Sequence, residues 1–170
     1  IAKLAQGQAD TLLTVTALAM RSPLLIAPAM DGGMYDHPAT QENIGILKTR
    51  GATFIGPAEG HLAAGLAGIG RMLETADILG HIRRLLGREG PLAGKKIVIT
   101  AGGTQEPLDP VRVLTNRSSG KQGYALAQTA LDMGAEVTLI TAPTALTPPV
   151  GARLVEVQTA EASPQTQPEP

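Results

Sequence analysis

A polar loop at residues 101–123 holds most of the side chains in this sequence that could do chemistry. Its charged and amide groups exceed what a turn needs, and they are Glu106, Asp109, Arg112, Asn116, Arg117 and Lys121. Small residues lie at both ends of the loop, namely Gly102, Gly103, Ser118, Ser119 and Gly120. Hydroxyls and unpaired backbone N–H groups bind phosphate where such a loop leads into a helix. The residue types therefore predict a phosphate site with an amide beside it.

Two regular elements must position this loop. The run at 96–100 is short, apolar and rich in β-branched residues, which predicts a buried parallel strand. Residues 124–133 have the apolar spacing of a helix, and Gly134 follows them as a helix stop. A strand, a glycine-rich loop and a helix start form the ligand-binding edge of many α/β sheets.

Strands and helices alternate along the rest of the sequence. We expect further strands at 24–27, 53–55, 136–141 and 153–157, further helices at 1–20, 40–49 and 74–86, and long loops at 28–38 and 56–70. This order predicts an α/β fold with two incomplete parallel-sheet, Rossmann-like units. The expected boundaries are 1–86 for the first unit, 87–94 for a linker, 95–160 for the second unit and 161–170 for a disordered tail.

Composition excludes several classes of function. The chain of 170 residues has no cysteine, which excludes disulfides, thiolate metal sites and a cysteine nucleophile. Its formal net charge is −1 and its basic residues are scattered, so we expect no nucleic-acid partner and no membrane partner. No apolar run approaches the roughly 20 residues that span a bilayer. We expect a cytoplasmic protein that binds small molecules.

The ends of the sequence indicate a fragment. Ile1 is not an initiator residue, and the first residues enter a helical pattern with no capping residue before them. They also lack the basic start and continuous apolar core of a signal peptide. The last residues carry prolines and no apolar side chain. We expect that upstream and downstream sequence completes both units, and that this fragment alone is inactive.

Two loops of the first unit carry further candidates that the residues leave open. Asp31 follows a strand between Met30 and Met34, where it could meet a ligand that the methionines cover. The alternative is that Gly32 and Gly33 make a turn and both methionines fill the core. The second loop, at 60–72, suits a lid that closes over a ligand, and its alternative is a plain glycine-rich loop with a surface histidine.

The order of the motifs resembles that of a known enzyme family. Five runs resemble the flavin-dependent phosphopantothenoylcysteine decarboxylases: Pro28–Tyr35, Pro38–Gln41, Gly56–Gly60, Leu62–Gly65 and Gly70–Met72. Two later runs are similar to the phosphopantothenate–cysteine ligases, at Ala101–Arg112 and Asn116–Lys121. The order of the two parts resembles the bifunctional bacterial enzymes of coenzyme A biosynthesis, and the resemblance covers roughly residues 1–160.

The resemblance implies two reactions. The ligase uses CTP to convert 4'-phosphopantothenate into an acyl-cytidylate, and cysteine then displaces CMP. The decarboxylase uses FMN to convert 4'-phosphopantothenoylcysteine into 4'-phosphopantetheine. Mg2+ accompanies CTP, and we expect no metal ligands of the protein itself on this fragment. The resemblance also implies a homo-oligomer, with trimeric decarboxylase units and dimeric ligase units.

The same resemblance assigns roles to single residues. Asn116 is implied to stabilise the acyl-cytidylate, and the substrate-binding positions of this unit are Gly102, Gly103, Ser118, Ser119 and Gly120. In the decarboxylase unit, Ala29 is implied to touch FMN, while Asp31 and Met34 clamp the substrate.

Two positions depart from the family pattern. Asp31 replaces an asparagine, and an ionised aspartate would repel a substrate carboxylate. Ala64 occupies the position of the proton-donor cysteine and has no proton to give. The alternative is therefore a ligase with a degenerate, non-catalytic first unit that binds flavin or only oligomerises. A nicotinamide-dependent enzyme is disfavoured, because the loop lacks the Gly-x-Gly-x-x-Gly pattern and no acidic residue ends the strand at 136–141.

Overall fold

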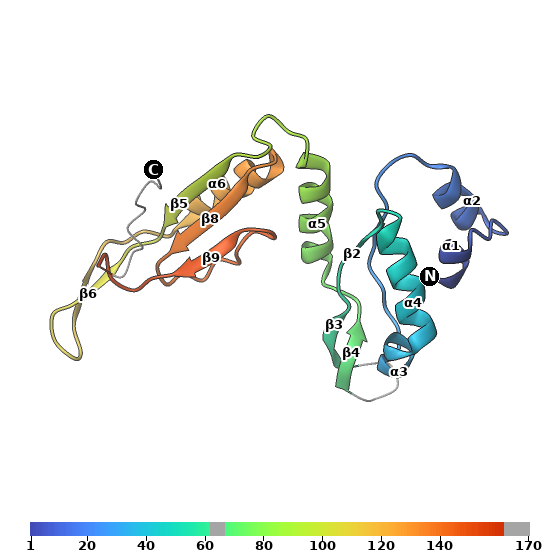
Figure 1. The fold of residues 1–170 in the computed structure, drawn as a ribbon. Coiled ribbons are helices and arrows are strands. Elements are labelled where there is room, and N and C mark those ends of the chain that lie inside the picture. Colours follow the sequence, from blue (N-terminus) through green and yellow to red (C-terminus); the bar gives the residue numbers. More distant parts are fainter. Residues whose placement is uncertain (62–66, 162–170) are drawn as a thin grey trace. The chain divides into compact units, whose positions relative to one another are not determined.

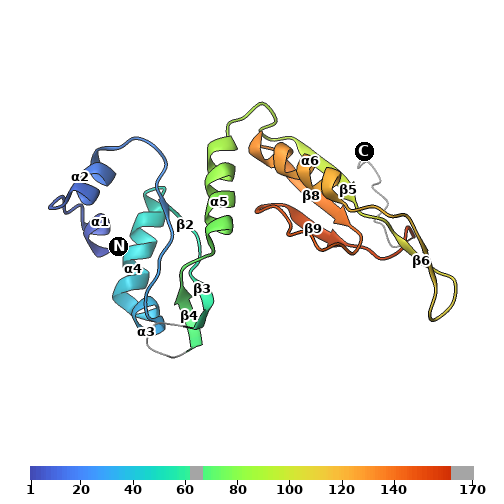
Figure 2. The same ribbon diagram turned by 180° about the vertical axis from the view of Figure 1, so that it is seen from behind.

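The computed structural model describes residues 1–61 and 67–161. The chain divides into two compact units, Ile1–Leu79 and Gly80–Pro170. Each unit contains parallel strands joined through helices, which confirms the α/β class expected from the sequence. The ribbon diagrams are coloured along the chain from blue to red and label most of the elements (Figures 1 and 2).

The first unit contains two short parallel strands and four helices. Its elements are α1 (Ala2–Gln6), α2 (Leu12–Ala19), β1 (Leu25–Ile26), α3 (Gly32–Asp36), α4 (Pro38–Thr49), β2 (Thr53–Phe54), β3 (Ala58–His61) and β4 (Ala67–Arg71). β1 and β2 pair in parallel, with Leu25 beside Thr53. The buried apolar residues are few and come from several elements: Ala5, Ile44, Leu47 and Ile55.

Three sequence-based expectations for this unit are wrong. The helix expected at 1–20 is two helices, because Gly7 ends α1 in the left-handed region and Thr11 starts α2 with a capping box. The loop expected at 28–38 contains α3, which Asp31 caps. The loop expected at 56–70 is mostly the antiparallel pair β3–β4, whose glycine-rich strands lack an alternating apolar pattern.

The second unit is a three-stranded parallel sheet with a helix on one face. Its elements are α5 (Thr75–Gly87, which begins in the first unit), β5 (Lys96–Ala101), β6 (Gln105–Pro107), β7 (Val113–Thr115), α6 (Lys121–Asp132), β8 (Glu136–Thr141) and β9 (Arg153–Glu156). The strand order is β5–β8–β9. α6 packs on β5 and β8, and this core includes Ala127, Leu131, Val137 and Leu139.

The polar loop expected at 101–123 also contains strands. β6 and β7 form their own antiparallel pair, with Glu106 opposite Leu114, and we call residues 105–115 the arm. The arm extends beyond the end of the parallel sheet (Figures 1 and 2). The sequence did not predict these strands because their residues do not alternate between apolar and polar.

Residues 87–94, expected as a linker, form turns that pack against the end of α6. Leu92 donates its backbone N–H to the carbonyl of Met133 at 2.9 Å. A Cβ added to Gly87 would lie 2.2 Å from the carbonyl oxygen of Asp132, and one added to Gly90 would lie 2.4 Å from that of Met133. Glycine is therefore needed at both positions, because the two backbones touch.

No helix among the described residues is long and apolar enough to cross a bilayer.

Candidate functional site

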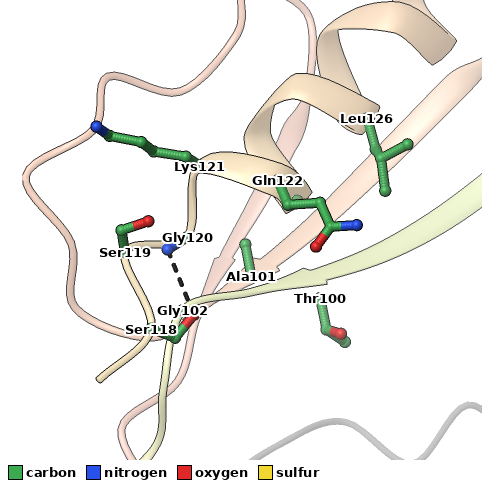
Figure 3. A pocket seen from close by; sticks show the side chains of 10 residues that line it. Thr100, Ala101, Gly102, Ser118, Ser119, Gly120, Lys121, Gln122 and Leu126 are labelled. Carbon is green, nitrogen blue, oxygen red and sulfur yellow. Dashed lines mark hydrogen bonds between the residues drawn. The ribbon is translucent and has the colours of Figure 1, made fainter. Parts of the chain in front are cut away.

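A pocket of about 290 Å³ lies where β5 ends and α6 begins (Figure 3). Four predicted site residues line it: Gly102, Ser118, Ser119 and Gly120. The other lining residues come from the same strand end and the first turns of the helix, namely Thr100, Ala101, Lys121, Gln122, Gly123 and Leu126. The structure thus brings the two ends of the polar loop to one place, as the sequence predicts.

The start of α6 leaves backbone donors at this pocket. Gly120 is the N-cap residue at φ 72°, and no side chain caps the helix. The first N–H groups of a helix have no partner inside the helix, and residues 121–123 line the pocket. The Gly120 N–H itself approaches the hydroxyl of Ser118 at 3.4 Å, a weak contact that Figure 3 marks. Backbone amides and two serine hydroxyls together suit a phosphate.

Gly123 shapes the pocket and was missed in the sequence. A Cβ at this position would lie 2.6 Å from the Cβ of Ala101 and 2.8 Å from the carbonyl oxygen of Thr100. The absent side chain therefore lets the first turn of α6 rest directly on β5. The sequence contained a signal for this contact, because a glycine three residues after the last glycine of such a loop is typical of close helix–strand packing.

The paired glycines after β5 have different surroundings. Gly102 has φ 85°, in the left-handed region, and a Cβ there would lie 3.2 Å from the Cβ of Ala142. Gly103 lies against Asn116, whose carbonyl oxygen would be 2.5 Å from an added Cβ. Neither Gly103 nor Asn116 lines the pocket, although Asn116 precedes the lining residue Ser118 by only two positions.

The two acidic side chains of the arm, Glu106 and Asp109, accept hydrogen bonds from backbone N–H groups and do not line the pocket. Asp109 accepts from the N–H groups of Val111 and Arg112 at 2.9 and 2.7 Å, and from the Arg112 guanidinium. The Val111 N–H first, and then these two Arg112 donors, lower the pKa of Asp109 below its usual value. Glu106 accepts from the N–H of Ala160 at 2.9 Å. These carboxylates thus hold the arm in shape.

The described candidates of the first unit are exposed. Ala29 follows β1, Asp31 is the N-cap residue of α3, and Met34 lies within α3. Asp31 accepts from the N–H of Gly33 at 2.9 Å and so caps α3. Gly33 lies inside that helix, so the expected turn is absent, and Met34 is 61% exposed, so it does not fill the core. Ala64, the remaining candidate, lies outside the described residues.

One backbone contact joins the two candidate loops of the first unit. Met30 donates its N–H to the carbonyl of Gly70 in β4 at 2.9 Å. Arg71, the cation expected at the tip of a lid, pairs instead with Glu74, and its side chain also lies against Gly60. His61 is exposed in β3. Among the described residues, no cluster of histidine and acidic side chains could hold a metal ion.

Two protein families match successive parts of this chain. Residues 1–87 match the flavoprotein family, and residues 92–166 match the C-terminal domain of DNA/pantothenate metabolism flavoproteins. The chain belongs to the flavoprotein family. The resemblance to bifunctional enzymes of coenzyme A biosynthesis, expected from the motifs, is thereby confirmed.

Individual relatives show how much of the chain is shared. The coenzyme A biosynthesis bifunctional protein CoaBC of Bacillus subtilis (strain 168) is 50% identical over 163 residues, which are 94% of this chain and 40% of that protein. A cysteine/cysteine sulfinic acid decarboxylase from an unknown prokaryote is 49% identical over 87% of this chain and 42% of its own length. The chain thus spans about two fifths of these relatives.

One solved structure is also similar to part of this chain. The crystal structure of the C-terminal domain of a CoaBC protein is 56% identical to this chain. The match covers 41% of this chain and 36% of that one, with a TM-score of 0.40.

Proposed function

We propose that the protein acts in coenzyme A biosynthesis as a bifunctional enzyme. One activity is the CTP-dependent ligation of 4'-phosphopantothenate to cysteine, and the other is the FMN-dependent decarboxylation of 4'-phosphopantothenoylcysteine. The observation that carries this proposal is the pocket at the start of α6, which gathers Ser118, Ser119 and Gly120. Asn116 lies outside its lining and precedes Ser118 by two positions in the sequence. The matches of residues 1–87 to the flavoprotein family and of residues 92–166 to the C-terminal domain of DNA/pantothenate metabolism flavoproteins support it.

The ligase reaction needs a phosphate held still beside a reacting carboxylate. The substrate carboxylate attacks the α-phosphorus of CTP, pyrophosphate leaves, and the cysteine amine then displaces CMP from the acyl-cytidylate. Ser118, Ser119 and the first backbone amides of α6 hold a phosphate group of a substrate. The Asn116 amide donates to an oxygen on which negative charge develops. Mg2+ enters with CTP and is coordinated by its phosphate oxygens.

The residues of the first unit fit a flavin at the end of β1. Pro28 is buried and Met30 is tied to Gly70, so the backbone between them is held, while the small Ala29 is exposed. The exposed Ala29 offers a small apolar contact for a flat ring, and FMN would supply oxidation of the substrate when bound. Met34, exposed on α3, supplies an apolar contact for the substrate.

Asp31 keeps a structural role whatever it does for the substrate. Both aspartate and asparagine accept the Gly33 N–H at an N-cap, so the cap does not distinguish them. We propose that Asp31 weakens the binding of a substrate carboxylate, because a carboxyl side chain stands where the resemblance implies an asparagine.

A second candidate function differs only in the first unit. The changes at Asp31 and Ala64 favour a ligase whose first unit binds flavin without completing decarboxylation, or only assembles subunits. Flavin absorbance of the purified full-length protein separates a bound cofactor from an empty scaffold. Native mass measurement tests the proposed homo-oligomer of trimeric decarboxylase and dimeric ligase units.

The test of the ligase proposal is an assay with all three substrates. Full-length protein is incubated with phosphopantothenate, cysteine and CTP, and CMP and phosphopantothenoylcysteine are quantified together. Equal amounts of the two products support the proposal, and CMP release that does not depend on phosphopantothenate contradicts it. Omitting cysteine should allow the acyl-cytidylate to form without ligation.

A further inference from the structure

Gly103 makes an unusually close contact with the backbone of Asn116. A Cβ added to Gly103 would lie 2.5 Å from the Asn116 carbonyl oxygen and 3.4 Å from the Thr115 hydroxyl oxygen. Gly103 is not among the glycines in the left-handed region. The requirement for glycine here is therefore space, not backbone conformation.

The Asn116 carbonyl is also the anchor of the turn that leads to the pocket. It accepts from the N–H of Ser118 at 2.8 Å and from the Thr115 hydroxyl at 3.3 Å. Ser118, Ser119 and Gly120 follow directly and line the pocket. A shift of this carbonyl would therefore displace the Asn116 side chain, which belongs to the same residue.

We propose that Gly103 is a positioning residue for Asn116. This role is separate from any space that the missing side chain of Gly103 leaves for a ligand. The proposal rests on the proposed function, because it gives Asn116 its role in ligation. A methyl group at residue 103 must push the Asn116 backbone away, since a backbone carbonyl cannot rotate aside as a flexible side chain can. Misplacement of a reacting group by about 1 Å can cost on the order of 100-fold in rate.

A double-mutant cycle in the full-length protein tests how Gly103 acts. Gly103→Ala should lower kcat of ligation by about 10–100-fold, with KM for phosphopantothenate changing less than about threefold. In the Asn116→Ala background, Gly103→Ala should cause no further loss, because the group that it positions is gone. Additive losses in the double variant would overturn the proposal, since Gly103 would then act independently of Asn116.

Gly90→Ala is the matched control for general damage. Its added Cβ also meets a backbone carbonyl, that of Met133 at 2.4 Å, but neither residue lines the pocket. It should lower thermal stability while the folded protein keeps its kcat. If Gly103→Ala fails to fold, Thr115→Val removes the hydroxyl contact to the Asn116 carbonyl from the other side. That variant should lower kcat several-fold, again with no effect in the Asn116→Ala background.

Hydrogen exchange separates failure of this inference from failure of the proposed function. Gly103→Ala, or Thr115→Val in its place, should speed exchange of the Ser118 amide, which bonds to the Asn116 carbonyl, whether or not the protein is a ligase. Unchanged exchange in the folded variant would overturn the positioning role and leave the ligase assignment standing. Faster exchange with full activity in Asn116→Ala would contradict the assignment of Asn116 instead.

Discussion

Four of the six candidate residues of the second unit line one pocket, whereas those described in the first unit lie on its surface. Gly102, Ser118, Ser119 and Gly120 share a cavity because the loop ends and the helix start are pressed together at glycines. Ala29, Asp31 and Met34 are exposed and share only a strand end and a short helix. The pocket of the second unit is therefore formed by the backbone packing of that unit alone. The exposed residues of the first unit would form a site only together with a ligand or another surface.

The substitution with the largest expected effect in this comparison is Asn116→Asp. In full-length protein we expect kcat/KM of ligation to fall at least about 100-fold, because a carboxylate replaces an amide donor beside a phosphate and a carboxylate. The thermal midpoint should change little, since residue 116 is exposed. Near-normal formation of phosphopantothenoylcysteine by the folded variant would remove Asn116 from the site.

The corresponding test of the first unit is Ala64→Cys. The resemblance places a proton-donating cysteine at this position, so the substitution should increase the yield of fully reduced phosphopantetheine over the oxidised intermediate. Chromatography of the two products after a fixed time gives the ratio. If the unmodified protein makes phosphopantetheine as fast as relatives with the cysteine, another residue supplies the proton.

Substitutions at two helix glycines, one in each unit, test how tightly each helix is packed. Gly123→Ala in α6 would bring a methyl group against Ala101 and the Thr100 carbonyl, and we expect a loss of about 1–3 kcal/mol in the free energy of unfolding. Gly45 in α4 is the matched control, because an added Cβ meets no atom within 4 Å. Gly45→Ala should gain about 0.5–1 kcal/mol through helix propensity. Denaturant unfolding measures both, and equal effects would contradict the packing at Gly123.

The smallest expected effect concerns the arm. The Val111 N–H first, then the Arg112 side chain and N–H, lower the pKa of Asp109 below the usual 3.8. The Asp109 carboxylate therefore orders the arm fully above pH 3.8. This ordering is lost as the pH falls through the lowered pKa of Asp109 in the folded protein. Asp109→Asn should speed amide exchange in the arm at neutral pH, and the difference should shrink in acid. A difference that grows in acid would contradict this assignment.

The sequence predicted the parallel strands well because their apolar residues are continuous. The runs at 96–100 and 136–141 became β5 and β8, and the glycine-rich loop between them leads into α6 as expected. It did not predict β3–β4 or β6–β7, because glycine and charged residues hide the alternation of a two-stranded pair. Short helix α3 was missed because its start, Gly32–Gly33, has the composition of a turn.

The pocket was predicted in its position but not in its construction. Loop composition indicated Ser118, Ser119 and Gly120, since phosphate sites favour these residue types. The contact of Gly103 with Asn116 joins residues distant in sequence, so spacing alone could not reveal it, whereas the position of Gly123 after Gly120 was a signal that went unused. The many charges of the loop also suggested chemistry, whereas Glu106 and Asp109 bind neighbouring backbone.

The central claim is that the start of α6 binds a phosphate group of the ligase substrates. The most direct measurement is the change in backbone amide NMR shifts on titrating phosphopantothenate, and separately CTP, into the full-length protein. We predict that at least one of them causes saturable shifts that are largest at residues 118–123, with little change in the arm at 108–112. Ligation by a protein whose amides at 118–123 respond to neither substrate would contradict the account.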